Sequence, residues 1–199
     1  MSIFYAKMTH MSNKYQINDL IRNTLVSHIR KDDICIDATL GKGRDSLFLL
    51  QHIPEGFLYG FDLQEEAVET SRKLLEDSGF SNFLLINDSH SNLRSYIKEA
   101  EIGCVMFNLG YLPGSDHQIH TESETTIEAI EACLPLLRED GIISVCFYPG
   151  TERGKQETTQ TLDWLRSLDP KQFLVLVNDY FNRPNDPPLP VFIIRLKKK

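Results

Sequence analysis

Short apolar runs alternate with longer segments in which apolar residues recur at helical spacing along most of the chain. The runs have the length and composition of buried strands, and the longer segments have the period of amphipathic helices. Strands are predicted over residues 34–39, 57–62, 83–90, 102–108, 141–147, 173–177 and 191–196. Helices are predicted over residues 15–29, from residue 46 onward, and over 64–78, 124–139 and 152–168. This alternation indicates an α/β fold with a doubly wound, parallel sheet.

The C-terminal part of the chain departs from this alternation. The last two strands are joined only by a loop rich in proline and asparagine, residues 182–190. Strands joined without a crossover helix pair antiparallel. The pattern therefore predicts a seven-stranded, mostly parallel sheet that ends in a C-terminal antiparallel hairpin, with helices on both faces. Pro135 lies inside the predicted helix 124–139, where proline kinks or loosens a helix.

A glycine turn follows the first predicted strand. Gly41 and Gly43 lie between that strand and the next helix, where backbone N–H groups can approach a bound cofactor closely. The third glycine of the dinucleotide-binding motif is missing, and so is the G-K-[ST] of a P-loop, so NAD binding is only weakly indicated. Taken alone, this G-x-G predicts no more than a tight turn.

Acidic residues end the first three predicted strands, at Asp37, Asp62 and Asp88. A carboxylate at the tip of the second strand can accept both ribose hydroxyls of an adenosyl group. Asp88 could accept a hydrogen bond from an adenine amino group. Each acid could instead cap the helix that follows it. Because three successive strands end in this way beside a glycine turn, the set favours an adenosyl-cofactor site.

The fourth strand ends in a different pair, Asn108 and Tyr111. The amide carbonyl can accept a hydrogen bond from an amine, and the aromatic ring can pack against that amine or an attached base. Since ligands of open α/β sheets bind beyond the carboxyl ends of the strands, a site for a nucleophilic nitrogen is predicted here. The alternative is a strand end with a turn. Asp116, His117 and His120 in the next loop are candidate proton acceptors, or solvated loop residues.

Composition bounds the class of protein. The chain of 199 residues is 41% hydrophobic and 25% charged, as in an ordinary globular protein. Residues 1–199 are predicted to form one domain, with 1–14 as a loose arm. No apolar run approaches the roughly 18 residues of a membrane helix, and no signal peptide is visible, so a cytoplasmic protein with no membrane partner is predicted. The four cysteines form no C-x-x-C pair, which predicts buried thiols and no metal site.

The formal net charge of −7 argues against a broad surface that coats nucleic acid. It leaves room for a small basic patch. Candidate phosphate partners are Arg153, Lys155, Arg183 and the tail 197–199, although surface and chain-end cations are commonly just solvated.

Several motifs taken together are similar to those of one family. They are the glycine turn with its flanks, two acid-containing segments, the run that begins at Met106, a threonine pair and a Tyr-Pro-Gly run, at residues 36–45, 60–64, 88–90, 106–114, 125–126 and 148–150. On these motifs the chain resembles a bacterial family long labelled rRNA methylases, which have the Rossmann-like fold of class I methyltransferases. Family members use S-adenosylmethionine to methylate the amine of 5-aminomethyl-2-thiouridine at the wobble position of the tRNA anticodon.

The resemblance implies that S-adenosylmethionine is the cofactor and that the anticodon stem-loop of tRNA is the partner of a monomer or homodimer. It implies a catalytic role for Asn108 and Tyr111 at the substrate amine. The implied cofactor-binding residues come from the strand ends and the glycine turn: Asp37, Thr39, Gly41, Gly43, Asp45, Asp62, Leu63, Gln64, Asp88, Ser89, His90 and Asn108. Two residues depart from the family pattern. Lys42 replaces an asparagine, and Thr151 stands where a histidine commonly follows the Tyr-Pro-Gly run.

Two other functions remain open from the sequence. The first is a methyltransferase of the same class that acts on another amine, in rRNA, a protein or a small molecule; the acidic charge balance slightly favours the protein or small-molecule substrate. The second is a Rossmann-like protein that binds an adenosyl ligand or NAD without catalysis. The missing third glycine and the run at Asn108 argue against the NAD version.

Overall fold

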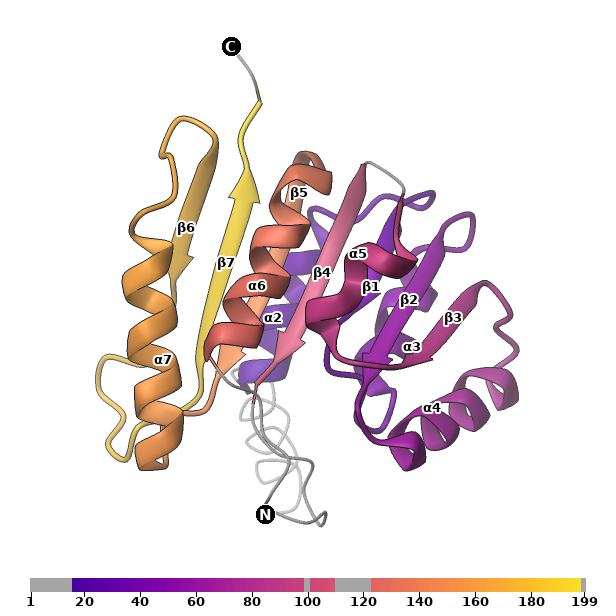
Figure 1. Cartoon of the computed structure of the whole chain (residues 1–199), viewed down its shortest axis with the longest axis horizontal. Helices are drawn as coiled ribbons and strands as arrows, with labels where there is room; N and C mark the ends of the chain where they lie inside the picture. Colours follow the sequence, from indigo (N-terminus) through magenta and orange to yellow (C-terminus); the bar gives the residue numbers. More distant parts are fainter. Residues whose placement is uncertain (1–15, 99–100, 110–122, 198–199) are drawn as a thin grey trace, which may run out of the picture.

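The computed structural model describes residues 16–98, 101–109 and 123–197, which form one seven-stranded sheet with helices on both faces (Figure 1). The strands are β1 (Ile34–Asp37), β2 (Phe57–Asp62), β3 (Phe83–Asn87), β4 (Ile102–Asn108), β5 (Leu137–Phe147), β6 (Phe173–Val177) and β7 (Leu189–Arg195). The helices are α2 (Ile17–Val26), α3 (Arg44–His52), α4 (Glu65–Asp77), α5 (Leu93–Tyr96), α6 (Ser123–Cys133) and α7 (Glu152–Leu165), with 3₁₀ turns η1 (His90–Asn92) and η2 (Leu134–Leu136).

The strand order is β3-β2-β1-β4-β5-β7-β6. Strands β1 to β5 pair in parallel, whereas β7 is antiparallel to both of its neighbours, β5 and β6. The predicted antiparallel hairpin is therefore confirmed, and its second strand lies inside the sheet. The arrowheads of the parallel strands point to one edge, the lower edge in Figure 1. Because β6 runs in the same direction as β5, the β6–β7 connection lies at this carboxyl edge too.

Two apolar layers cover the sheet. Helices α5, α6 and α7 pack on one face through side chains such as Leu93, Ile130 and Leu165. Helices α2, α3 and α4 pack on the other face through side chains such as Leu25 and Leu49. The central strands are thus buried from both sides, which explains why they appear in the sequence as continuous apolar runs.

The predicted helix 124–139 is wrong in its C-terminal part. Helix α6 ends at Cys133, η2 follows, and β5 already begins at Leu137 instead of residue 141. Pro135 has no N–H to donate and clashes with the preceding turn, so it ends the helix and does not merely kink it. Leu137 then pairs with Ile102 of β4, which draws the segment into the sheet.

Three further corrections concern the ends of the third and first strands and the short helix α5. It was predicted to reach residue 90, but β3 ends at Asn87, and the polar residues that follow form η1. The short helix α5 was not predicted; one turn of helix is too short to show a period in the sequence. The first strand likewise ends at Asp37, two residues earlier than predicted.

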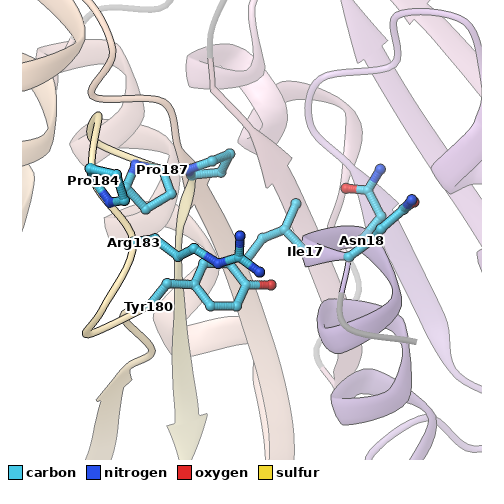
Figure 2. A pocket seen from close by; sticks show the side chains of 8 residues that line it. Ile17, Asn18, Tyr180, Arg183, Pro184 and Pro187 are labelled. Carbon is cyan, nitrogen blue, oxygen red and sulfur yellow. The ribbon is translucent and has the colours of Figure 1, made fainter. Parts of the chain in front are cut away.

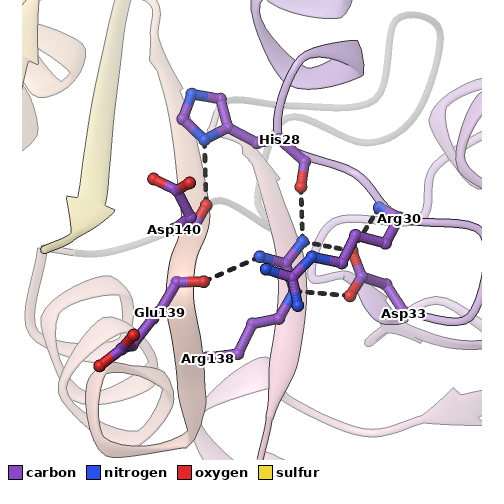
Figure 3. Close-up of polar contacts among 6 residues, drawn as sticks. All are labelled: His28, Arg30, Asp33, Arg138, Glu139 and Asp140. Carbon is purple, nitrogen blue, oxygen red and sulfur yellow. Dashed lines mark hydrogen bonds and ion pairs between the residues drawn. The ribbon is translucent and has the colours of Figure 1, made fainter. Parts of the chain in front are cut away.

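A buried ion pair fastens the edge of the sheet opposite the carboxyl ends (Figure 3). Arg138 donates from Nε to Asp33 Oδ1 at 2.6 Å and from Nη2 to Asp33 Oδ2 at 2.7 Å. The guanidinium also donates to the carbonyl oxygens of His28 and Glu139. Both side chains of the pair are about 5% exposed, so β5 is tied to the loop between α2 and β1 by charges withdrawn from water.

No helix in the described part of the chain is long and apolar enough to cross a membrane. All four cysteines are buried and unpaired, as predicted. Within the described residues, no group of three or more potential ligands is arranged to hold a metal ion.

Candidate active site

The glycine turn is built by two residues with left-handed backbone. Gly41 has φ = 51° and Gly43 has φ = 71°, a region that favours glycine. A Cβ on Gly43 would lie 2.8 Å from Ser71 Oγ, so helix α4 leaves no room for a side chain there. Gly43 N donates to Leu40 O at 2.8 Å and closes the turn. Glycine is therefore required at residue 43 both by the backbone conformation and by the close packing of the turn on α4.

Asp62 joins the end of β2 to this turn. Its Oδ2 accepts a hydrogen bond from Gly41 N, and its Oδ1 accepts one from Gln64 N, both at 2.9 Å. Each carboxylate oxygen has a second lone pair, so the carboxylate can hold the turn and still accept from a ligand hydroxyl. Leu63, 57% exposed, lies next to it at the surface. Asp62 does not cap α4, whose N-cap residue is Gln64; it holds the glycine turn and can still accept from a ligand.

Asp88 is engaged locally. It accepts hydrogen bonds from Ser89 N at 2.7 Å, Asn92 Nδ2 at 2.9 Å and Tyr96 Oη at 2.9 Å. These hydrogen bonds, chiefly those from Asn92 and Tyr96, lower the pKa of Asp88. Asp88 therefore stabilises η1 and α5 as an ionised acceptor, and its predicted contact with adenine stays a prediction.

His90 supports the turn from beneath. Its Nδ1 lies 3.0 Å from Ala38 O, and its ring meets the Phe107 ring edge to face at 5.6 Å. Burial lowers the pKa of His90, so the imidazole is neutral and donates from Nδ1 to that carbonyl. Nε2 is then a buried acceptor without a partner among the described residues. His90 thus packs behind the turn.

Asp37 is the buried acid at the end of β1. It accepts from Ser46 Oγ at 2.7 Å and from Thr39 N at 3.3 Å. Burial, and then the nearby Asp45 carboxylate, raise the pKa of Asp37 to about 7, against the opposing effect of the Ser46 hydroxyl. The charge of the Asp37 carboxyl, which lies below the glycine turn, therefore depends on pH near neutrality.

Asn108 lies at the end of β4, directly beside these groups. Its backbone N donates to Thr39 Oγ1 at 2.7 Å, and its Nδ2 donates to Asp45 Oδ2 in a short hydrogen bond. The other Asp45 oxygen accepts from Arg22 Nη2 at 2.9 Å. Because Asp45 takes the amide N–H, the amide cannot flip, and Asn108 Oδ1 is left buried without a partner among the described residues. A buried acceptor without a partner lowers the stability of the fold unless a ligand donates a hydrogen bond to it.

Arg22 is the member of this network that sequence reasoning missed. It comes from α2 and lies over the Phe48 ring, 5.2 Å from its centroid, while it holds Asp45. Nothing in its local sequence distinguishes it from a surface arginine of an amphipathic helix. Thr39 and Asp45 were predicted as cofactor residues; the structure places both against Asn108.

The remaining predicted residues divide into two groups. Lys42 is exposed on the glycine turn, and Thr151 caps α7 by accepting from Gly154 N at 3.0 Å, so a threonine has a structural use there. Tyr111, Asp116, His117, His120, residues 1–14 and most of the tail 197–199 lie outside the described residues.

The chain is similar in sequence to a curated methyltransferase. The chain is 33% identical over 178 residues to a curated Arabidopsis thaliana protein named tRNA (mnm(5)s(2)U34)-methyltransferase, chloroplastic, a match that covers 84% of this chain and 65% of that protein. The chain thus spans less than two thirds of the length of this relative.

Two solved structures are similar over nearly their whole length. A putative rRNA-methylase from Clostridium thermocellum superposes with a TM-score of 0.86 at 37% identity, over 89% of this chain and 96% of that one. A putative methyltransferase from Streptococcus mutans in complex with SAH has a TM-score of 0.83 at 34% identity, over 91% and 98%. The fold is therefore that of class I methyltransferases. The family model described as "Putative rRNA methylase" matches residues 58–194, and the chain belongs to that family.

Proposed function

We propose that this protein is an S-adenosylmethionine-dependent RNA methyltransferase that methylates the amine of 5-aminomethyl-2-thiouridine at the wobble position of tRNA. The observation that carries the proposal is the unpaired, buried oxygen Oδ1 of Asn108. Asp45 accepts the N–H on the other side of the same amide, which fixes the orientation of Oδ1. The name of the Arabidopsis relative and the SAH in the Streptococcus mutans structure support the substrate and the cofactor. The predicted cytoplasmic location stays a prediction, since that relative is chloroplastic.

The residues present fit an adenosyl cofactor. Asp62 at the end of β2 keeps free lone pairs for ribose hydroxyls, and the glycine turn that it holds lies beside it, with left-handed backbone at Gly41 and Gly43. Leu63 and Gln64 lie at the same strand end. When bound, S-adenosylmethionine supplies an electrophilic methyl group on a sulfonium.

Asn108 orients the nucleophile. Its Oδ1 accepts one N–H of the substrate amine and so directs the nitrogen lone pair. Asp45 fixes the amide against rotation, and Thr39 fixes the backbone that carries it. Positioning of this kind supplies most of the acceleration of a displacement that asks little covalent chemistry of the protein. The amine must also be neutral, and the predicted packing of Tyr111 against it would help to exclude water.

The substitution Asn108→Ala tests the proposal. We expect it to abolish methyl transfer to tRNA that lacks the wobble methyl group, measured by nucleoside mass spectrometry, while S-adenosylhomocysteine binding by calorimetry stays within about two-fold, because the proposal assigns Oδ1 to the substrate amine. Asn23→Ala, on the exposed side of α2, is the matched control.

Three results would count against parts of the proposal. Near-normal turnover of Asn108→Ala would remove this amide from the mechanism. Transfer by the wild type to rRNA or a protein, but not to tRNA, would favour the other amine substrates. A thermal shift with NADH and none with S-adenosylhomocysteine would replace the cofactor.

A further inference from the structure

An open groove lies at the carboxyl edge, between the first turn of α2 and the β6–β7 connection. It has a volume of about 450 Å³. Its lining consists of Gln16, Ile17 and Asn18 on one side and Tyr180, Arg183, Pro184, Pro187 and Pro188 on the other. Figure 2 shows the Tyr180 ring and the Arg183 guanidinium reaching from the connection toward Ile17. An aromatic face, a cation and apolar walls thus share one open surface.

The connection that forms this groove is held in shape. Arg183 N donates to Tyr180 O at 2.9 Å and closes a turn with Phe181 and Asn182 at its corners. Lys155 of α7 pairs with Asp186 at 2.9 Å and ties the connection to the helix. Three prolines further restrict its backbone. The connection therefore has a defined turn at Tyr180–Arg183 and one exposed ion pair to α7.

Phe181 has no structural use in this arrangement. Its side chain is 99% exposed at the corner of the turn, the highest value among the large apolar residues in the described part of the chain. An isolated surface apolar residue needs no explanation, but Phe181 directly follows Tyr180 in the turn that also carries Arg183, and Tyr180 and Arg183 both line the groove. Aromatic rings and guanidinium planes are the groups on which proteins stack unpaired bases of RNA.

Helix α2 runs from the groove to the network that holds the Asn108 amide. Asn18 lines the groove, and Arg22 lies one turn further along the same face of the helix. Arg22 holds Asp45, which holds Asn108. If one base of an RNA strand lies at Asn108, the nucleotides next to that base would therefore lie along this face of α2, toward the groove.

We propose that the groove binds the unpaired nucleotides next to the target uridine, with a base stacked on Phe181 or Tyr180 and a phosphate on Arg183. The proposal rests on the proposed function, because it assumes that the substrate is the loop of an RNA. Its chemistry is that of a single-stranded RNA site: local, aromatic and lightly basic, which agrees with a chain whose net charge is −7.

The test uses the full chain and a synthetic anticodon stem-loop that carries 5-aminomethyl-2-thiouridine. We expect Phe181→Ala and Arg183→Gln each to raise the KM for this RNA about ten-fold, with kcat and S-adenosylhomocysteine affinity unchanged. Arg183→Gln should also reduce the slope of log affinity against log salt by about one. Leu84→Ala on β3, where the side chain is exposed, and Arg72→Gln on α4, where it is half-buried, are matched controls that should leave all of these values unchanged.

Crosslinking provides a second readout. With a photoreactive thiouracil placed beside the target uridine, the crosslinked peptide should contain Tyr180 or Phe181.

Several outcomes would contradict the proposal. A crosslink elsewhere, or wild-type KM values in both variants while the wild type methylates the RNA, overturns the groove as the RNA site and leaves the proposed function standing. If Phe181→Ala and Arg183→Gln weaken binding to an RNA stem that has no loop as much as they weaken binding to the anticodon stem-loop, the single-stranded site is overturned. If Phe181→Ala instead dissociates a dimer in sedimentation, the surface belongs to a second copy of the chain. Absence of wild-type transfer to this RNA would overturn both proposals.

Discussion

Asp45 at the start of α3 and Asn108 at the end of β4, 63 residues apart in the chain, are joined by a short hydrogen bond from the Asn108 amide. The bond leaves one orientation for the carboxamide, because a carboxylate accepts only the N–H side. It turns a generic strand-end asparagine into a fixed acceptor. The orientation of Asn108 Oδ1 is therefore set by Asp45, and in the proposed mechanism Asp45 acts without touching the substrate.

The substitution Asp45→Ala tests this positioning role. We expect kcat to fall by about a hundred-fold, since a small misplacement of a reacting group costs that much, and the KM for S-adenosylmethionine to change less than about two-fold. Asp77→Asn, at the exposed end of α4, is the control. A large loss of cofactor affinity with normal kcat would instead support the cofactor-binding role predicted from the sequence.

The substitution Asp62→Ala should weaken S-adenosylmethionine binding by a few kcal/mol in calorimetry. It removes the charged acceptor predicted for the ribose and also releases Gly41 N and Gln64 N. Asp62→Asn keeps one acceptor oxygen and should lose less. Unchanged cofactor affinity in both variants would mean that Asp62 only shapes the turn.

Asp37 should make stability depend on pH. A carboxyl whose pKa is raised to about 7 binds its proton more tightly in the folded than in the unfolded chain, whose pKa is near 3.9. The unfolding free energy that it contributes is therefore fully present below about pH 4 and is lost as the pH rises to about 7. Asp37→Asn, which stays neutral, should flatten urea-unfolding stability over this window. An identical pH profile in variant and wild type would contradict this.

The buried pair Arg138–Asp33 should dominate the stability of the opposite edge. Arg138→Met leaves Asp33 buried without its partner, and we expect it to lower the free energy of unfolding by roughly 3–5 kcal/mol in denaturant titration. Arg166→Ala, which breaks an exposed pair with Asp163, should cost less than about 1 kcal/mol. Gly103→Ala should also destabilise, because its Cβ would lie 2.1 Å from the Asp33 carboxylate. Equal stabilities of Arg138→Met and Arg166→Ala would show that the buried pair adds nothing.

Much of the fold could be predicted from local pattern. The apolar runs became strands because both faces of the sheet are covered, and the missing crossover helix before β7 correctly indicated an antiparallel hairpin. The start of β5 could not be predicted, because Leu137 is placed in the sheet by its pairing with Ile102, 35 residues away in the chain. The polar residues that follow Leu137 have no strand-like alternation of their own.

The candidate site could be predicted only as a set of strand-end residues. The acids at the ends of β1 and β2 and the amide at the end of β4 gather at one edge because parallel strands end there. Which of them touch each other depends on long-range geometry. The links from Arg22 to Asp45 and from Asp45 to Asn108 span 23 and 63 residues, and no spacing rule connects them.

The insertion of β7 between β5 and β6 has a consequence for how the molecule assembles. Strand β6 is made first, yet its hydrogen-bonding partner comes from the segment synthesised after it. Until residues 189–195 have left the ribosome, β5 carries an open edge and β6 has nowhere to dock. Completion of the sheet, and with it the β6–β7 connection at the groove, therefore has to wait for the synthesis of β7.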